Sequence, residues 1–308
     1  MQQVLSKLFA NIEKDLGAHR FCMLALEALQ EALLQYKDTN RKQLKKNLLD
    51  IFKLLQGTKP KYAILLDAFY KILDAEAQAS NKTFIKDVVK QIDLIHASYQ
   101  LEKLEMVKTA QSMDVEGKNI LIYDHSHSVQ DVLNAFHQDG KKFTVVLAEQ
   151  DIEKTGDNIE FFHNLAIDYK VVPSYMLSHV DKAIDMVFFG ALTMQQHYHF
   201  VMDPGTKSLI SHFYLEKKPI YVFLTTSKFS LWPLEKGVPH VYSKPQKRKH
   251  HTMSHIQFER LKFSHDRLSI DLVTKIITEK GIFNPEELKD VFDDLFKKRQ
   301  KLRKLYLK

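Results

Sequence analysis

The sequence is poor in cysteine and has no long uninterrupted apolar stretch. A single cysteine, Cys22, among 308 residues excludes an internal disulfide framework and is typical of a protein from a reducing compartment. No apolar, uncharged run approaches the length of about 18 residues that a transmembrane helix needs. Residues 1–7 do not open a basic region followed by an apolar one, so we expect no secretory signal peptide. These absences predict a cytoplasmic protein that does not enter membranes.

Cations exceed anions, and the excess is concentrated in two segments. The formal net charge is +7. Basic residues crowd residues 297–308, and a second cluster contains Lys247-Arg248-Lys249. Such patches can bind nucleic acid or acidic proteins. Because no nucleic-acid-binding motif accompanies them, we interpret them as a solvated helix end and a solvated loop, and we do not expect a nucleic-acid partner.

The first 115 residues have the composition and the periodicity of helices. They contain only two glycines and one proline. Apolar residues recur with the helical period over residues 48–55, and again from Phe84 to Met106 without a helix breaker. We therefore predict an N-terminal helical domain, residues 1–115, whose last helix is long and leads into a second domain.

Residues 116–308 change to a pattern of strands alternating with helices. Four apolar runs, each closed by small or polar residues, occupy residues 119–123, 143–148, 185–189 and 220–224. Strands that are covered on both faces are continuously apolar, and strand-helix-strand repeats favour a parallel sheet. The predicted fold class is α/β, with the helical domain followed by a Rossmann-like parallel-sheet domain at residues 116–308. This domain would include a basic loop at 240–256, helices at 268–280 and 285–308 with Gly281 capping the first, and a basic C-terminal end.

The residues that close the four runs are the candidate ligand-binding residues. Ligands of parallel sheets bind outside the carboxyl ends of the strands, which we call the mouth of the sheet. At three of the run ends, the predicted binding residues are Asp124, His125, Ser126, His127, Glu149, Gln150 and Lys228. The other run ends in Gly190-Ala191-Leu192, whose leucine offers no proton-transfer chemistry.

Two His-x-His pairs lie near the predicted mouth, His125/His127 and His197/His199. Alternate residues of an extended segment point the same way, so each pair could converge on one ligand. A transition metal and an anion are both compatible with imidazoles. The alternative is that these are ordinary loop histidines in a chain that contains 15 of them. We favour this alternative and predict no metal and no cofactor.

The order of these motifs resembles a known family. It is similar to the family that joins the alpha, beta and delta regulatory subunits of translation initiation factor 2B with ribose-1,5-bisphosphate isomerase and methylthioribose-1-phosphate isomerase. The segments that carry the likeness are residues 124–133, 149–156, 185–192 with Gly205-Thr206, 219–234 and 276–282, the last resembling the family's closing helix. The resemblance implies a helical domain, a Rossmann-like domain and dimerisation through the latter.

The resemblance also implies where this sequence departs from the isomerases. Their catalytic cysteine corresponds to Asp124 and their catalytic aspartate to Leu192, and leucine cannot exchange protons. Their substrate-clamping arginine corresponds to Asp151, which would repel a phosphate. Lys59 stands near the place of a phosphate-contacting Arg-Pro motif, and we include it among the ligand-binding candidates.

These departures predict a non-catalytic protein similar to the initiation factor 2B regulatory subunits. It would act through contacts with a protein partner, as a homodimer or as a subunit of a larger complex. Its ligand would be a phosphorylated small molecule, either a sugar phosphate or a nucleotide. We predict no catalytic residues. The alternative is a divergent aldose-phosphate isomerase, similar to ribose-1,5-bisphosphate isomerase, that uses Asp124 and Glu149 as its acid and base.

Overall fold

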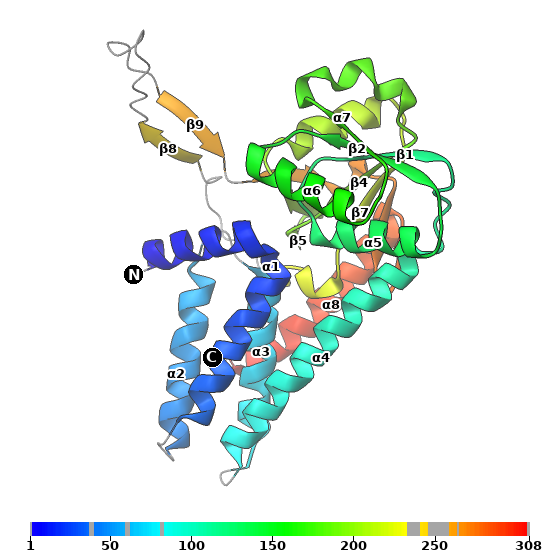
Figure 1. Ribbon diagram of the computed structural model, residues 1–308. Helices are drawn as coiled ribbons and strands as arrows, with labels where there is room; N and C mark the ends of the chain where they lie inside the picture. Colours follow the sequence, from blue (N-terminus) through cyan, green and yellow to red (C-terminus); the bar gives the residue numbers. More distant parts are fainter. Residues whose placement is uncertain are drawn as a thin grey trace.

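Four helices form the N-terminal part of the computed structural model, which describes residues 2–36, 40–58, 62–80, 83–232, 241–245, 259–263 and 265–306. They are α1 (Gln2–Leu34), α2 (Arg41–Gln56), α3 (Ala63–Gln78) and α4 (Phe84–Ala110) (Figure 1). Their apolar faces share one core, which also takes in Trp232. Helix α1 is kinked at Gly17, where φ is +72°. The predicted helical region and its long last helix are confirmed.

A seven-stranded sheet forms the second part of the chain, in the order β12-β11-β7-β4-β1-β2-β3. All neighbouring pairs are parallel except β11 and β12. The strands are β1 (Lys118–Ile122), β2 (Phe143–Ala148), β3 (Tyr169–Val172), β4 (Met186–Gly190), β7 (Ile220–Phe223), β11 (Lys275–Thr278) and β12 (Gly281–Phe283). The four apolar runs are therefore the four adjacent strands β7, β4, β1 and β2. The predicted α/β class and parallel sheet are confirmed.

Helices follow the strands as the strand-helix alternation predicts. They are α5 (His127–Gln138), α6 (Ile152–Asn164) and α7 (Thr206–Leu215). Each begins where a polar group satisfies its first backbone N–H groups. Ser126 Oγ accepts from Val129 N at 3.4 Å, and Asp151 Oδ1 accepts from Lys154 N at 2.9 Å.

The predicted helix at 268–280 is wrong. This segment contains the end of β10 (Asp266–Ser269), a short 3-10 turn and β11, and Gly281 starts β12 instead of capping a helix. The likeness of 276–282 to a closing helix fails for the same reason. Ile276 and Ile277 are β-branched and buried, and they pair with β7 in the sheet, which outweighs the helical spacing of the surrounding apolar residues.

Two small antiparallel sheets complete the described chain. One contains β5 (Thr193–Gln195), β6 (His199–Met202) and β10. The other pairs β8 (Val241–Pro245) with β9 (Glu259–Phe263) and projects from the body of the molecule (Figure 1). Part of the predicted basic loop at 240–256 is therefore strand, and its residues 246–256 lie outside the described residues.

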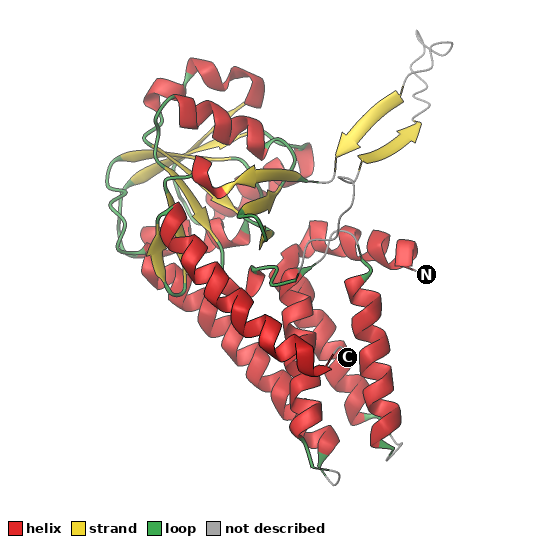
Figure 2. Ribbon diagram, turned by 180° about the vertical axis from the view of Figure 1, so that it is seen from behind, coloured by secondary structure: helices red, strands yellow, loops and turns green. Residues whose placement is uncertain are grey.

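The last helix, α8 (Pro285–Tyr306), connects the sheet to the helical part. Its start is a capping box, in which Glu287 N donates to Asn284 Oδ1 at 2.9 Å and Asn284 N donates to Glu287 Oε2 at 2.7 Å. It then runs beside the helical part (Figure 2), where Arg299 pairs with Asp67 of α3. Because α8 joins both parts, the division into domains at residue 115 stays a prediction.

Candidate functional site

Asp124 lies at the centre of the sheet mouth, directly after β1. Its Oδ2 accepts a hydrogen bond from the backbone N–H of Gly190, at the end of the neighbouring strand β4, at 3.0 Å. Its other oxygen, Oδ1, is buried and has no hydrogen-bond partner. A side chain at Gly190 would overlap Ser126 and would come close to Asp124, so the glycine permits the close approach of the two strand ends.

Burial and, after it, the nearby Asp203 carboxylate raise the pKa of Asp124 to about 7. The Gly190 N–H and the Lys154 ammonium act in the opposite direction. The carboxyl is therefore protonated for an appreciable part of the time at neutral pH. A proton on Oδ1 would turn this unpartnered acceptor into a donor that faces the mouth.

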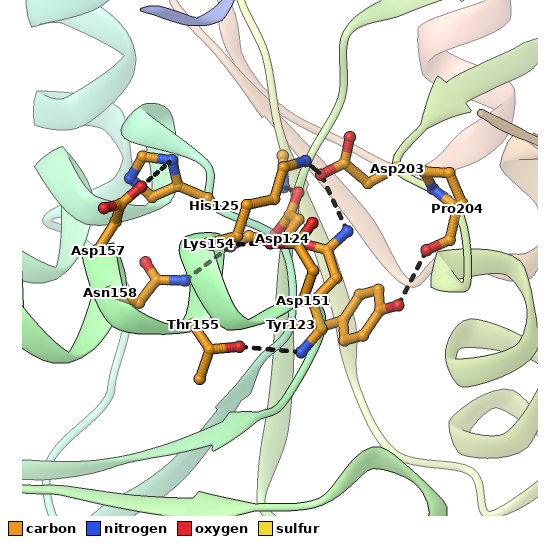
Figure 3. Close-up of polar contacts among 12 residues, drawn as sticks. Tyr123, Asp124, His125, Asp151, Lys154, Thr155, Asp157, Asn158, Asp203 and Pro204 are labelled. Atoms are coloured by element: carbon orange, nitrogen blue, oxygen red, sulfur yellow. Dashed lines mark hydrogen bonds and ion pairs between the residues drawn. The ribbon is translucent and has the colours of Figure 1, made fainter. Parts of the chain in front are cut away.

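An ion pair that the sequence did not reveal covers Asp124. Lys154, in the first turns of α6, pairs with Asp203, which follows β6 (Figure 3). Gln150 Nε2 donates to the same carboxylate at 3.2 Å. Asp203 follows the apolar run Phe200-Val201-Met202 and precedes Pro204-Gly205. A polar residue at the end of an apolar run is the same pattern that identified the other run ends. Lys154 carried no such signal, because it lies inside a helix.

A buried amide chain fixes the backbone of the mouth. Gln130 Nε2 donates to Asn158 Oδ1 at 3.0 Å. Asn158 Nδ2 donates to the carbonyl of Asp124 at 3.4 Å (Figure 3). Tyr123 donates from its hydroxyl to the Pro204 carbonyl at 2.9 Å. Burial and the surrounding carboxylates, Asp203 first, raise the pKa of Tyr123 to about 12. This half of the mouth is therefore acidic and internally bonded.

The opposite half of the mouth is basic and is built partly by α1. The rings of His125 and His127 lie 4.9 Å apart, and a side chain at Gly17 would approach the His127 Nδ1 to 3.1 Å. Burial, followed by the charges of Arg20, His125, Lys103 and Lys228, lowers the pKa of His127 to about 4. The imidazole is therefore neutral at pH 7, in a positive potential that several cations create.

His19 shows that the same potential extends along α1. Burial and, as the second cause, the charge of Lys228 lower the pKa of His19 to about 4. Burial also lowers the pKa of His125, although Asp157 opposes this, with the two groups 4.0 Å apart. Positions 19 and 20 are more than 100 residues from His127 in the chain. Gly17 could have indicated a kink in α1, but the sequence did not indicate that α1 contributes to the mouth.

The remaining predicted residues occupy different surroundings. Ser126 caps α5, and Lys228 Nζ donates to the Ala191 carbonyl at 3.5 Å. Glu149 is exposed, and its carbonyl accepts from Ser174. Leu192 donates its backbone N–H to the Val201 carbonyl at 2.9 Å, and Lys59 lies outside the described residues. A binding role for any of these residues stays a prediction.

The two His-x-His pairs do not share one environment. His197 lies in the turn between β5 and β6, with φ at +66°, beside residues of α8, and its carbonyl is 2.7 Å from His199 Nδ1. Within the described ranges, no three side chains among His, Cys, Asp and Glu gather as metal ligands. In that same part of the chain, no helix has both the length and the apolar content to span a bilayer.

A mostly parallel sheet with an adjoining helical bundle, and a mouth between them with one acidic and one basic half, defines a Rossmann-like protein with a polar site at the mouth of its sheet. Residues 14–285 match the model of the Initiation factor 2 subunit family. The chain belongs to this family.

Several relatives extend this result. The chain is 24% identical over 218 residues to translation initiation factor eIF2B subunit delta of Dictyostelium discoideum, which covers 65% of the chain. The matched part is 35% of that relative, so the chain spans about a third of its length. The eIF-2B structure from Pyrococcus horikoshii OT3 is similar in fold, with a TM-score of 0.73 at 17% identity over 91% of this chain and 97% of that one. For eIF2B beta from Chaetomium thermophilum, the TM-score is 0.65 at 15% identity, over 96% and 91%.

Proposed function

We propose that the protein is a non-catalytic regulatory member of its family, which acts in the cytoplasm through contacts with other proteins. The observation that carries this proposal is the composition of the mouth. Of the two positions that the resemblance assigns to proton exchange, one is Asp124 and the other is Leu192. The ion pair of Lys154 with Asp203, together with Gln150, occupies the neighbourhood of Asp124.

Assembly with other chains is part of this proposal. A structure of similar fold is the tetrameric eIF2B-beta2-delta2 complex from Chaetomium thermophilum, at a TM-score of 0.70 and 15% identity over 96% of this chain and 95% of that one. By analogy, this chain would form a homodimer or join a larger complex of related subunits. A protein partner of that kind requires no chemistry at the mouth.

The mouth would then bind an anion as a signal. The basic half contains Arg20, Lys228 and the neutral His127, together with Lys103, which pairs with Asp131 at 2.8 Å. This half is suited to a phosphate group, whereas the acidic half would repel one. A sugar phosphate or a nucleotide would place its phosphate against α1 and α4. Because these helices belong to the helical part and the strand ends to the sheet, such a ligand would bridge the two.

Turnover assays test the absence of catalysis directly. Purified protein is incubated with ribose 1,5-bisphosphate and with methylthioribose 1-phosphate, and the expected result is no product above the level of a heat-denatured control. Turnover that disappears in Asp124→Asn would overturn the proposal and support the alternative isomerase. The specific observation behind that alternative is the Asp124 pKa near 7, which suits a general acid or base. In that case Glu149→Gln would also abolish turnover.

Binding of the anion is tested by following the histidine ring protons by NMR. Inorganic phosphate and ribose 5-phosphate are the probes. A bound phosphate should raise the pKa of His127 from about 4 toward neutrality, because it offsets the neighbouring cations. Arg20→Gln should weaken the effect, and Lys46→Gln, at an exposed position on α2, is the matched control. An unchanged His127 titration at millimolar probe would refute the ligand site.

A further inference from the structure

Helix α4 carries a second apolar face that no described residue covers. Leu94, Leu101 and Leu104 are exposed by 53%, 57% and 64%. The opposite side of the same helix is buried, with Val88, Ile92, Ile95, Tyr99, Met106 and Ala110 in the protein core. Figure 1 shows α4 at the edge of the helical bundle, with no element drawn in front of it. A helix that is apolar on two opposite faces has one face available for another molecule.

The exposed face has the spacing of a coiled-coil seam. Residues separated alternately by three and four positions line up along one side of a helix and can pack against a second helix. On α4, the residues with this spacing are Asp87, Lys90, Leu94, Ala97, Leu101, Leu104 and Lys108. The apolar positions are central and the charged ones lie at the two ends. Residues 87–108 span about 33 Å at the helical rise of 1.5 Å per residue.

The charges at the ends match a second copy in the antiparallel direction. If Leu94 lies opposite Leu101 of the second copy, then Asp87 lies opposite Lys108 and Lys90 lies opposite Glu105. Two-fold symmetry forms each of these pairs twice. Lys108 and Glu105 pair with each other at 3.8 Å on the helix surface, and with 74% and 45% of their side chains exposed they remain accessible to a partner.

Other registers are less favourable. A parallel arrangement in register would place each charge against its own copy. An antiparallel arrangement with Leu94 opposite Leu104 would place Lys90 against Lys108. Like charges that face one another destabilise helical pairs. Of these three arrangements, the antiparallel one with Leu94 opposite Leu101 is the one in which both Lys90 and Lys108 face an acidic residue.

We propose that a second copy of this chain docks on α4 through this seam, antiparallel and two-fold symmetric, with Leu94 opposite Leu101. This contact runs along α4 and so differs from dimerisation through the sheet domain that the resemblance implies. Where both contacts form, the α4 seam joins dimers into larger assemblies.

Charge reversal tests the register by sedimentation velocity over a range of protein concentrations. Lys90→Glu and Glu105→Lys should each weaken the association about tenfold, because each replaces two attractive pairs by two repulsive ones. The double variant should return to within about threefold of the unchanged protein. Lys46→Glu, on α2, makes the same charge change outside the seam and should have no effect. Failure of the double variant to recover, or an unchanged protein that shows no α4-dependent association at 100 micromolar, would overturn the proposal.

Cysteine cross-linking tests the contact independently. Ala97 lies beside the proposed two-fold axis, opposite Ser98 of the second copy, and the single native cysteine, Cys22, is buried. Ala97→Cys should give a covalent dimer under mild oxidation. Ile152→Cys, at a position that is 91% exposed on α6, is the control and should remain uncross-linked. Equal cross-linking of the two variants, or none at position 97, would contradict the proposed contact.

Discussion

Replacing Asp124 with asparagine should remove a pH-dependent cost to folding. Burial, together with Asp203, raises the pKa of this carboxyl from about 3.8 to about 7. A difference of about three pKa units, at about 1.4 kcal/mol each, corresponds to about 4 kcal/mol of folding free energy. Asparagine has nearly the same shape, stays neutral at every pH and can still accept the Gly190 N–H.

The direction of the effect follows from where the proton is held. In the unfolded chain, Asp124 ionises near pH 4, whereas in the folded protein it keeps its proton until near pH 7. This group therefore lowers stability progressively as the pH rises from 4 to 7, and the loss is complete above pH 7. Asp124→Asn should be close to the unchanged protein in stability at pH 4.5 and more stable by up to about 4 kcal/mol at pH 8.

Urea unfolding at pH 4.5, 6 and 8, followed by circular dichroism, measures this difference. Asp50→Asn, at an exposed position on α2, removes the same charge and controls for the change in net charge. The informative quantity is the dependence of the stability difference on pH. A difference between Asp124→Asn and the unchanged protein that stays constant from pH 4.5 to pH 8 would refute the reasoning.

Three further predictions concern buried residues of the helical part and of the mouth. Arg299→Ala should lower the unfolding free energy by about 2 kcal/mol in urea unfolding, because Oδ1 of the buried Asp67 loses its charged donor while Lys71 and the Tyr99 hydroxyl remain on Oδ2. Gly190→Ala should cost about 3 kcal/mol or more in the same assay, since the added carbon would overlap Ser126. Cys22 should not react with an aromatic disulfide reagent at pH 8 until the protein is unfolded, because burial raises its thiol pKa.

The central strands could be predicted from sequence because burial on both faces leaves a continuous apolar run. The edge strand β3 could not, since it has four residues, two of which are exposed, and so has no such run. Strand β11 was missed for another reason. Its neighbours Leu268, Leu272 and Val273 imitate a helical spacing, and only the pairing of Ile276 with β7 determines its structure.

For the site, the sequence indicated the acid at position 124 but not its surroundings. Ligands of parallel sheets bind outside the carboxyl ends of the strands, and this principle identified Asp124 and Gln150, which follow β1 and β2. Lys154 lies one turn into a helix, and Arg20 comes from a helix more than 100 residues earlier. Their positions depend on how α6 and α1 pack, which local patterns do not encode. The raised pKa of Asp124 depends on the same packing.

Side chains of the chain itself already accept hydrogen bonds from backbone N–H groups at the starts of the helices around the mouth. Asp266 Oδ2 accepts from the backbone N–H groups of Gly205 and Lys207, both at 2.9 Å, at the start of α7. Asp151 caps α6 and Ser126 caps α5. Free N–H groups at a helix start are the usual seat of a phosphate in α/β proteins. These three helix starts already have a polar group of the chain on their N–H groups.

Anion binding at this mouth would therefore depend on side-chain cations, and these are mostly outside the sheet. Arg20 and Lys103 belong to α1 and α4, and Lys228 follows β7. Long cationic side chains are flexible and their attraction is screened by salt, so binding would weaken as ionic strength rises. It would also depend on how α1 is seated against α5, next to His127 and Gly17. The affinity for such a ligand would therefore depend on the position of the helical part relative to the sheet. A partner protein that contacts both parts could respond to that position.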